Sequence, residues 1–347
     1  MAPPSVPPSS TLPPDLILDI HDLAAIILDT HSRTESLFPH AQLVEVNRGI
    51  TTPATLPSHV FPPEWHNTAN DRKRLAYILK KDSHQTERVT IDTFAHPDGV
   101  KVPAGRELTR RDLEDVYWRC KTFNNGYVLA YVAQRVFDRL PPTAKLRART
   151  STKHEVVCKP SDVTVAEIVV VPKEACLMIE YEPRPDLGPN YINETEHLSG
   201  FDRPGMPWVY LLVGEPKSVN LAEDPRVVLD LVTSQIGGRG AGGEIFSLER
   251  GADYHSKVLP KVAHEMESYK LSGKLQLLSS PDLLRAHANA LVELVIERLA
   301  KIANGEDRFC RYCGRDGVEQ RCSKCKTAYF CPSCHLLGWK YHKVWCS

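Results

Sequence analysis

Residues 306–347 read EDRFCRYCGRDGVEQRCSKCKTAYFCPSCHLLGWKYHKVWCS, and no other stretch constrains the fold of this chain as strongly. It holds seven of the ten cysteines of the chain, which together with one histidine form four close pairs. The pairs are Cys310/Cys313, Cys322/Cys325, Cys331/Cys334 and His342/Cys346. One tetrahedral structural zinc takes four nitrogen or sulfur ligands. Eight ligands in four pairs therefore predict two closed zinc sites.

The helix expected after Cys331 determines how the pairs share the metals. Pro332 suits the first turn of a helix, and His342 and Cys346 are four residues apart, so a helix places both on one face. Cys334 and His342 would be about 12 Å apart along this helix, whereas ligands of one zinc lie roughly 4 Å from each other. We therefore expect a cross-brace, in which alternate pairs share a metal. The first zinc would be held by Cys310, Cys313, Cys331 and Cys334, and the second by Cys322, Cys325, His342 and Cys346.

This C-terminal segment resembles the MYND-type zinc finger. The resemblance rests on CRYC (310–313), RCSKCKTAYFC (321–331) and CHLLGWKYHKVWC (334–346). It implies the same cross-brace. The family usually has three residues inside its third pair, whereas Cys331 and Cys334 are separated by two. Pairing Cys331 with His335 would restore the usual spacing, but Cys334 keeps the family's distances to Trp339 and His342. We favour Cys334.

Length and charge limit the function classes. A chain of 347 residues predicts about two domains. Its 43 basic and 43 acidic residues balance, so no overall charge points to nucleic acid or membranes. The zinc module has an excess of four basic charges, which falls to about +1 once seven thiolates and two Zn²⁺ are counted. This charge is too small for phosphate binding, so we expect no direct contact with nucleic acid.

The first 14 residues contain six prolines and no basic residue. We expect residues 1–14 to be a disordered tail rather than a secretion signal. The remaining cysteines, Cys120, Cys158 and Cys176, are isolated, as in proteins of reducing compartments. We therefore expect a cytoplasmic and/or nuclear protein that is not secreted.

For residues 15–305 the sequence predicts a globular α+β region of unknown fold, mixed but largely helical. A possible sub-boundary lies near 141–160, and the zinc module follows at 306–347. We expect this region to fold without the module. Helices are expected at 15–31, 71–81, 109–140 with a break at 124–126, 224–236, 259–269 and 281–304. Strands are expected at 163–171, 175–181 and 208–213. Residues 32–70 are expected to be irregular.

Two groups of residues in the main region could indicate chemistry but have simpler interpretations. The glycine-rich stretch GGRGAGG at 237–243 lacks the lysine of a P-loop, so we expect a flexible connector. His255, His264 and His287 lack the spacing of a metalloprotease helix, and we expect solvated or satisfied histidines. We expect no enzyme. The alternative is an enzyme, such as a methyltransferase, in residues 15–305 with an accessory MYND module.

The resemblance implies that the C-terminal module binds short proline-rich peptides. In the family a glutamine and a tryptophan help to hold the peptide; Trp339 matches the tryptophan, whereas His335 stands in place of the glutamine. We expect Tyr329, His335 and Trp339 to contact a peptide that adds as a strand beside 326–330. This function fits a regulatory adaptor or transcriptional co-regulator. A second alternative is a purely structural zinc cap.

The chain carries one segment that resembles the family's preferred ligand. Residues 185–189 read PDLGP, a P-x-L-x-P match within a stretch that we expect to be an exposed loop. We expect it to be an internal ligand that docks on the zinc module, within one chain or between two. Other partners would be proteins with similar proline-rich peptides.

Overall fold

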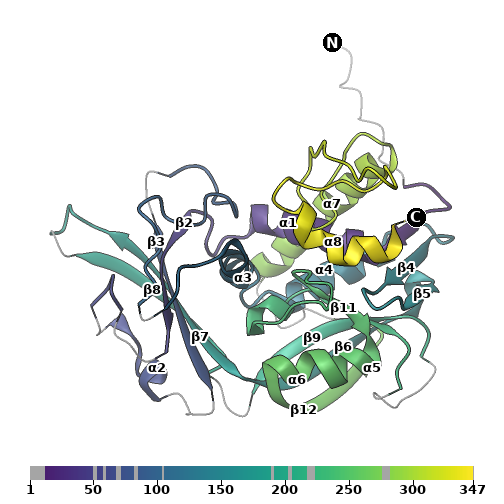
Figure 1. Ribbon diagram of the computed structural model, residues 1–347. Coiled ribbons are helices and arrows are strands. Elements are labelled where there is room, and N and C mark those ends of the chain that lie inside the picture. Colours follow the sequence, from purple (N-terminus) through teal and green to yellow (C-terminus); the bar gives the residue numbers. More distant parts are fainter. Residues whose placement is uncertain are drawn as a thin grey trace.

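The computed structural model describes residues 12–49, 53–57, 60–67, 72–81, 85–103, 105–188, 191–201, 205–216, 223–275 and 282–346. Most of the proline-rich tail and Pro189 of the PDLGP segment therefore lie outside the described residues. The fold is mixed, with helices and strands in similar amounts (Figure 1). The expectation of a largely helical main region is wrong, because the strands form three sheets.

The helices are α1 (Ile20–Thr34), α2 (Pro63–Asn67), α3 (Arg110–Lys121), α4 (Gly126–Asp138), α5 (Gly251–Asp253), α6 (Leu259–Val262), α7 (Asp282–Ala303) and α8 (His335–Trp345), with short 3-10 turns at Pro160–Asp162 and Thr233–Ile236 and a π-helical turn at Tyr254–Val258. The strands are β1 (Ile17–Asp19), β2 (Ala41–Arg48), β3 (Lys73–Lys81), β4 (Lys145–Arg149), β5 (Glu155–Cys158), β6 (Val163–Pro172), β7 (Glu174–Pro183), β8 (Ile192–Ser199), β9 (Met206–Val213), β10 (Val227–Asp230), β11 (Ser247–Arg250) and β12 (Ala263–Ser272).

Local signals explain the helices that were predicted correctly. α1 begins where Asp19 accepts a hydrogen bond from the backbone N–H of His21. α3 begins with a capping box between Thr109 and Asp112. The expected break follows α3, where Asn124 adopts a positive φ of 52° before α4 starts. The strands expected at 163–171, 175–181 and 208–213 are β6, β7 and β9.

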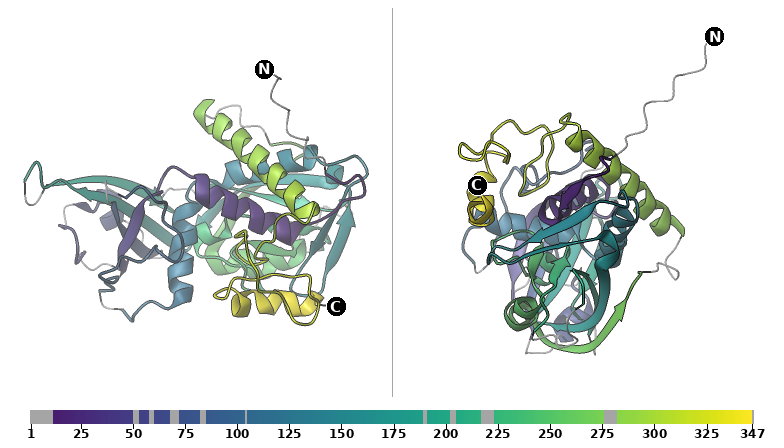
Figure 2. Two further views of the ribbon diagram at one scale, coloured as in Figure 1. Left: turned by 90° about the horizontal axis from the view of Figure 1, so that it is seen from above. Right: turned by 90° about the vertical axis from the view of Figure 1, so that its right-hand side faces the viewer.

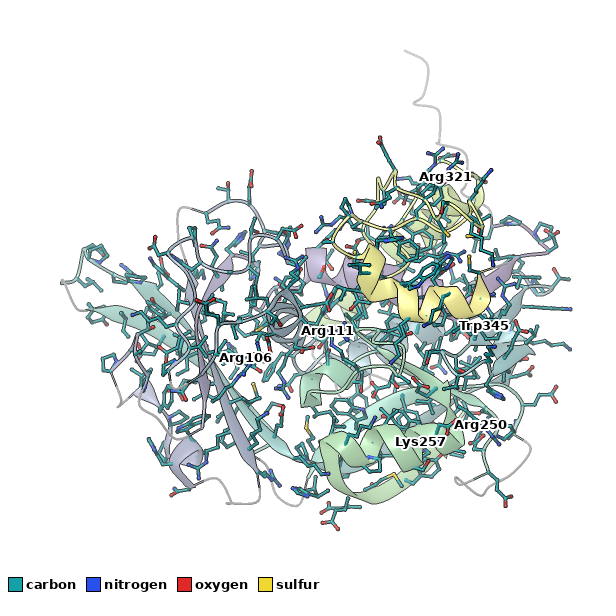
Figure 3. All side chains as sticks on the ribbon, in the orientation of Figure 1. Arg106, Arg111, Arg250, Lys257, Arg321 and Trp345 are labelled. Carbon is teal, nitrogen blue, oxygen red and sulfur yellow. The ribbon has the colours of Figure 1, made fainter. Side chains whose placement is uncertain are left out.

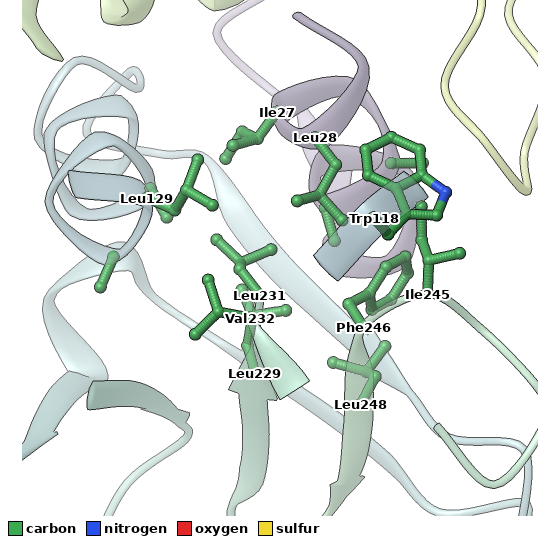
Figure 4. Packing of buried hydrophobic residues seen from close by; sticks show 14 of the residues in the cluster. Ile27, Leu28, Trp118, Leu129, Leu229, Leu231, Val232, Ile245, Phe246 and Leu248 are labelled. Atoms are coloured by element: carbon green, nitrogen blue, oxygen red, sulfur yellow. The ribbon is translucent and has the colours of Figure 1, made fainter. Parts of the chain in front are cut away.

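A five-stranded sheet in the order β11-β10-β9-β6-β12 forms the centre of the body. α4 packs against β9, while α7 packs on α4 and α1 (Figures 1 and 2). A smaller sheet in the order β1-β4-β5 lies at the start of α1. These elements enclose the main hydrophobic core, in which Leu28 of α1, Trp118 of α3 and Phe246 pack together (Figure 4).

A four-stranded sheet in the order β2-β3-β7-β8 extends from the body (Figure 1). β3 pairs in parallel with β7 and antiparallel with β2, so it is a central strand. A second core of Trp65, Phe61, Ile78 and Ile179 covers one face of this sheet.

Four sequence expectations are wrong for related reasons. The expected helix at 71–81 is β3, because its apolar centre is buried on both faces of a sheet, which removes the alternation typical of a strand. β2 occupies part of the stretch 32–70 that was expected to be irregular. The expected helix at 224–236 contains β10, since Asp224 binds the guanidinium and backbone of Arg226 instead of capping a helix. The expected helix at 259–269 ends at Val262, where β12 starts to pair with β6.

Candidate metal centres

The first group of predicted ligands lies inside the C-terminal module. The Sγ atoms of Cys310, Cys313, Cys331 and Cys334 lie within 4.8 Å of one another. Cys310 and Cys313 sit on a tight turn that ends at Gly314, whose φ of 82° favours glycine. Cys331 and Cys334 form the turn before α8, in which the N–H of Cys334 donates to the carbonyl of Cys331.

The second group joins the middle turn to α8. The ligand atoms of Cys322, Cys325, His342 and Cys346 also lie within 4.8 Å of one another. Cys322 and Cys325 come from a turn closed by the Lys326 N–H and the Cys322 carbonyl. Burial lowers the pKa of His342, which favours the neutral imidazole that a metal requires.

Distances within both groups fit zinc. A tetrahedral zinc with Zn–S bonds of about 2.3 Å places its sulfur ligands about 3.8 Å apart, and a sulfur and a nitrogen about 3.6 Å apart. The Sγ atoms of Cys313 and Cys331 are 3.7 Å apart, and those of Cys322 and Cys346 are 3.8 Å apart. Cys325 Sγ lies 3.7 Å from His342 Nε2. The two groups can therefore each hold one zinc ion, and alternate pairs come together as a cross-brace.

His335 lies outside both groups. Its ring faces Trp339 and Phe330 with ring centroids 6.2 and 5.9 Å apart, while Cys334 joins the first group. The structure thus has two residues between the ligands of the third pair. Phe330 fills the space between the two groups and α8, so close to Gly338 that a Cβ there would lie 2.8 Å from the Phe330 ring.

Arginines surround the first group. Four thiolates and one Zn²⁺ carry a net charge of −2, which nearby cations stabilise. Arg311 pairs with Asp22 of α1 at 3.2 Å, and Arg315 pairs with Asp92 at 2.8 Å. Burial alone would lower the pKa of Arg315, but hydrogen bonding to Asp92 and the neighbouring thiolates outweigh it and raise the pKa. The first group is therefore electrostatically tied to the body of the protein.

The three predicted peptide-contact residues have different surroundings. Trp339 is 40% exposed and Leu336, one turn earlier on α8, is 82% exposed. Tyr329 is half-buried and forms β-bridges with Cys310 on one side and Arg321 on the other. Both edges of the chain at Tyr329 itself are thus bridged, and strand addition beside 326–330 stays a prediction.

The glycine-rich stretch 237–243 is an ordered loop beneath the module, not a flexible connector. The Gly243 carbonyl accepts hydrogen bonds from Arg111 at 2.8 Å and from Arg239 and the Tyr312 hydroxyl at 3.2 Å. The Ala241 carbonyl accepts from Lys340 of α8 at 2.5 Å. Sequence reasoning missed this role and that of Tyr312, although a tyrosine between two metal ligands was a visible signal.

Across the part of the chain that the structure describes, no third group of potential metal ligands is found. Of the histidines weighed above, His255 hydrogen-bonds the Tyr210 hydroxyl at 3.1 Å, and the ring of His287 lies against that of His31. None of the described helices is both long and apolar enough to cross a membrane.

Comparison with known proteins gives one partial likeness. A protein of Caenorhabditis elegans, "Dauer abnormal formation protein 25", is 42% identical over 40 residues, which is 12% of this chain and 10% of that protein. The matched part thus spans about a tenth of that relative. Neither a family profile nor a solved structure matches the chain.

Proposed function

We propose that this chain is a zinc-dependent interaction protein whose contact surface is the outward face of α8. The resemblance of residues 310–346 to the MYND type supports this proposal, as do the two groups able to hold zinc. The single observation that carries it is the exposed apolar pair of Leu336 and Trp339 on a helix whose zinc ligand His342 faces inward.

The two faces of α8 differ sharply. Tyr341 is buried and stacks on His21 of the body, with ring centroids 3.8 Å apart and planes at 10°. Leu336 and Trp339 lie on the other side of α8 from Tyr341 and stay exposed, although the Trp339 ring also lies against the zinc ligand His342. The rings of His335 and His342 lie 6.2 and 5.8 Å from the Trp339 ring, which limits the freedom of the indole. A pre-oriented, exposed tryptophan is the kind of residue that dominates small interfaces.

The partner that suits this surface is a short peptide with proline and leucine side chains. Proline rings pack well on an indole face, and an extended peptide loses little entropy on binding. Lys343 is exposed one turn after Trp339 on the same helix, so an acidic residue beside the apolar ones would be favourable.

The chain's own PDLGP segment fits this description only between two molecules. Its described part lies in the loop between β7 and β8, where Leu187 is 58% exposed. The β7–β8 hairpin projects at the far left in Figure 1 and in the left view of Figure 2, away from the zinc module on the right half of the body. Docking within one chain would require a large rearrangement, so a second copy or another protein is the better occupant.

The test uses the zinc-loaded full chain and a fluorescent PDLGP peptide in an anisotropy titration. Leu336→Ser and Trp339→Ala should each weaken binding about tenfold, the effect of removing an interface hot spot. Leu294→Ser is the matched control, since Leu294 is 42% exposed on α7, away from α8. Zinc content must stay equal across the variants. Unchanged affinity in both α8 variants would refute this binding face.

A further inference from the structure

The first metal-ligand turn is inserted into the body. A Cβ at Gly314 would overlap the carbonyl of Ala25 in α1 and would lie 2.7 Å from the Asp29 side chain. The φ of 82° and this close approach together require glycine. The turn that carries Cys310 and Cys313 is therefore in direct contact with the backbone of α1.

Tyr312, between those two ligands, extends further into the body. Its side chain is only 2% exposed. Its hydroxyl lies 2.8 Å from Glu114 Oε2 and 3.1 Å from guanidinium nitrogens of both Arg111 and Arg239. α3 supplies Glu114 and Arg111, whereas Arg239 belongs to the glycine-rich loop. One side chain of the first zinc turn thus joins two elements of the body.

Ion pairs surround this insertion. Arg298 of α7 pairs with Asp29 of α1 at 2.8 Å and also donates to the Gly314 carbonyl. Arg33 of α1 forms a two-pronged pair with Asp316, with N–O distances of 2.8 and 2.9 Å. Together with the Arg311–Asp22 and Arg315–Asp92 pairs, these contacts reach elements from α1 to α7.

The turn of the second zinc group has a different environment. Within the described residues, the hydrogen bonds and ion pairs of segment 317–327 stay inside the module, for example Lys324 to the Cys346 carbonyl at 2.9 Å. Arg321 lies on the side of the module away from the body, whereas Trp345 of α8 points to β4 and β5 (Figure 3). Cys325 and Cys346 are also less buried than any ligand of the first group except Cys313.

We propose that the first zinc site attaches the module to the body. Zinc at this site and the folding of α1 and loop 237–243 then stabilise each other. A ligand that binds only the docked state stabilises that state, and docking raises the zinc affinity by the same factor. The second site reaches the body through Tyr341, Lys340 and Trp345 of α8 rather than through its own turn at 322–325, so it loses zinc faster and with less effect on the body. This inference does not depend on peptide binding.

This attachment predicts that zinc release has two kinetic phases when a chromophoric chelator removes zinc from the full chain. The fast phase comes from the second site and the slow phase from the first. Deuterium uptake in α1 and loop 237–243 should rise with the slow phase and not with the fast one. Uptake that rises with the fast phase, or that stays unchanged after both, would overturn the proposal, and this measurement needs no variant.

Two glycines of the module provide a matched pair of variants. Gly314 and Gly317 both have positive φ, 82° and 64°, so alanine causes similar backbone strain at each. A Cβ at Gly317 meets nothing within 4 Å, whereas one at Gly314 collides with α1. Gly314→Ala should accelerate the slow phase at least tenfold and expose Arg239 to trypsin, while Gly317→Ala should do neither. Equal effects of the two substitutions would show that the docked turn does not control the first site.

Discussion

Replacing Tyr312 by phenylalanine removes one oxygen atom and leaves the ring in place, so it measures how firmly the zinc module is attached. The hydroxyl contacts a carboxylate and two guanidinium groups in a site that is 2% exposed. A hydrogen bond to a charged group contributes about 1.5–3 kcal/mol. Glu114 keeps a second partner, Arg239 Nη2 at 2.7 Å, which limits the cost of leaving the carboxylate buried. We therefore expect a loss of about 2 kcal/mol.

The size of the thermal shift reports which part of the chain unfolds together. The unfolding entropy of a protein is about 2.1 cal/mol/K per residue, so a unit of 347 residues that unfolds as a whole has an unfolding entropy of about 0.7 kcal/mol/K. A loss of about 2 kcal/mol then lowers the melting temperature of the zinc-loaded chain by about 3 °C in one calorimetric transition. A module that melted separately would show its own transition, which Tyr312→Phe would move far more, because so small a unit has a much smaller unfolding entropy.

A double-mutant cycle separates the docking contact from other effects of the substitution. Tyr312→Phe combined with Glu114→Gln should show a coupling energy of about 1–2 kcal/mol. Tyr329→Phe is the control, because Tyr329 belongs to the same module but is only half-buried and stacks under Arg308. We expect the control to change stability by less than about 0.5 kcal/mol. Additive effects of Tyr312→Phe and Glu114→Gln would refute the interpretation that this contact holds the module on the body.

Metal analysis of the purified chain should give two zinc ions per chain. Cys334→Ser should lower this zinc content, whereas His335→Ala should leave it unchanged. The reverse result would show that His335, and not Cys334, pairs with Cys331 as a ligand. A second prediction concerns pH. Burial raises the pKa of Glu249, beneath the glycine-rich loop, to about 7 from its usual 4.5. The folded state then binds this proton more tightly than the unfolded state, so the free energy of unfolding falls as pH rises from 4.5 to about 7. Glu249→Gln, which keeps an acceptor for the Ala241 N–H, should stabilise the chain by about 1–3 kcal/mol at pH 8 and much less at pH 4.5, measured by urea unfolding. A gain of equal size at both pH values would contradict a raised pKa.

The sequence predicted the zinc groups well because their constraint is local. The length of the helix after Cys331 keeps the third and fourth pairs from sharing one metal, and the resemblance to the MYND type implies that alternate pairs share one, as the structure has it. Helix starts were also local, as the capping box at Thr109 shows. In contrast, β3 reads LAYIL in its centre, a run that fits either a buried strand or a helix. Only its pairing with β7, about 100 residues later in the chain, decides between them.

Apart from Tyr312 between two metal ligands, the attachment of the module to the body had no local signal. Arg33 and Asp316 are 283 residues apart in sequence, and each alone is an ordinary surface charge. Gly314 would be expected at a turn for its positive φ alone, but the same missing side chain also allows contact with α1. Contacts of this kind depend on the fold of both partners, and periodicity or spacing cannot reveal them.

α7 ends at Ala303 and the zinc module begins at residue 306, so a short connection joins the two. A helix that leads directly into a zinc module predicts a domain boundary, and from the sequence we expected residues 15–305 to fold alone. The hydrophobic core, however, continues from α1 through Tyr312 to Phe330 without a break. Removing the module would expose the apolar surface under Tyr312 and leave Glu114 without its tyrosine partner. The proposed attachment through the first zinc site would make zinc a condition for the stability of the body, while Leu336 and Trp339 of α8 stay exposed. The proposed structural role and the proposed interaction role of the module would thus use opposite faces of α8, so the two proposals are compatible.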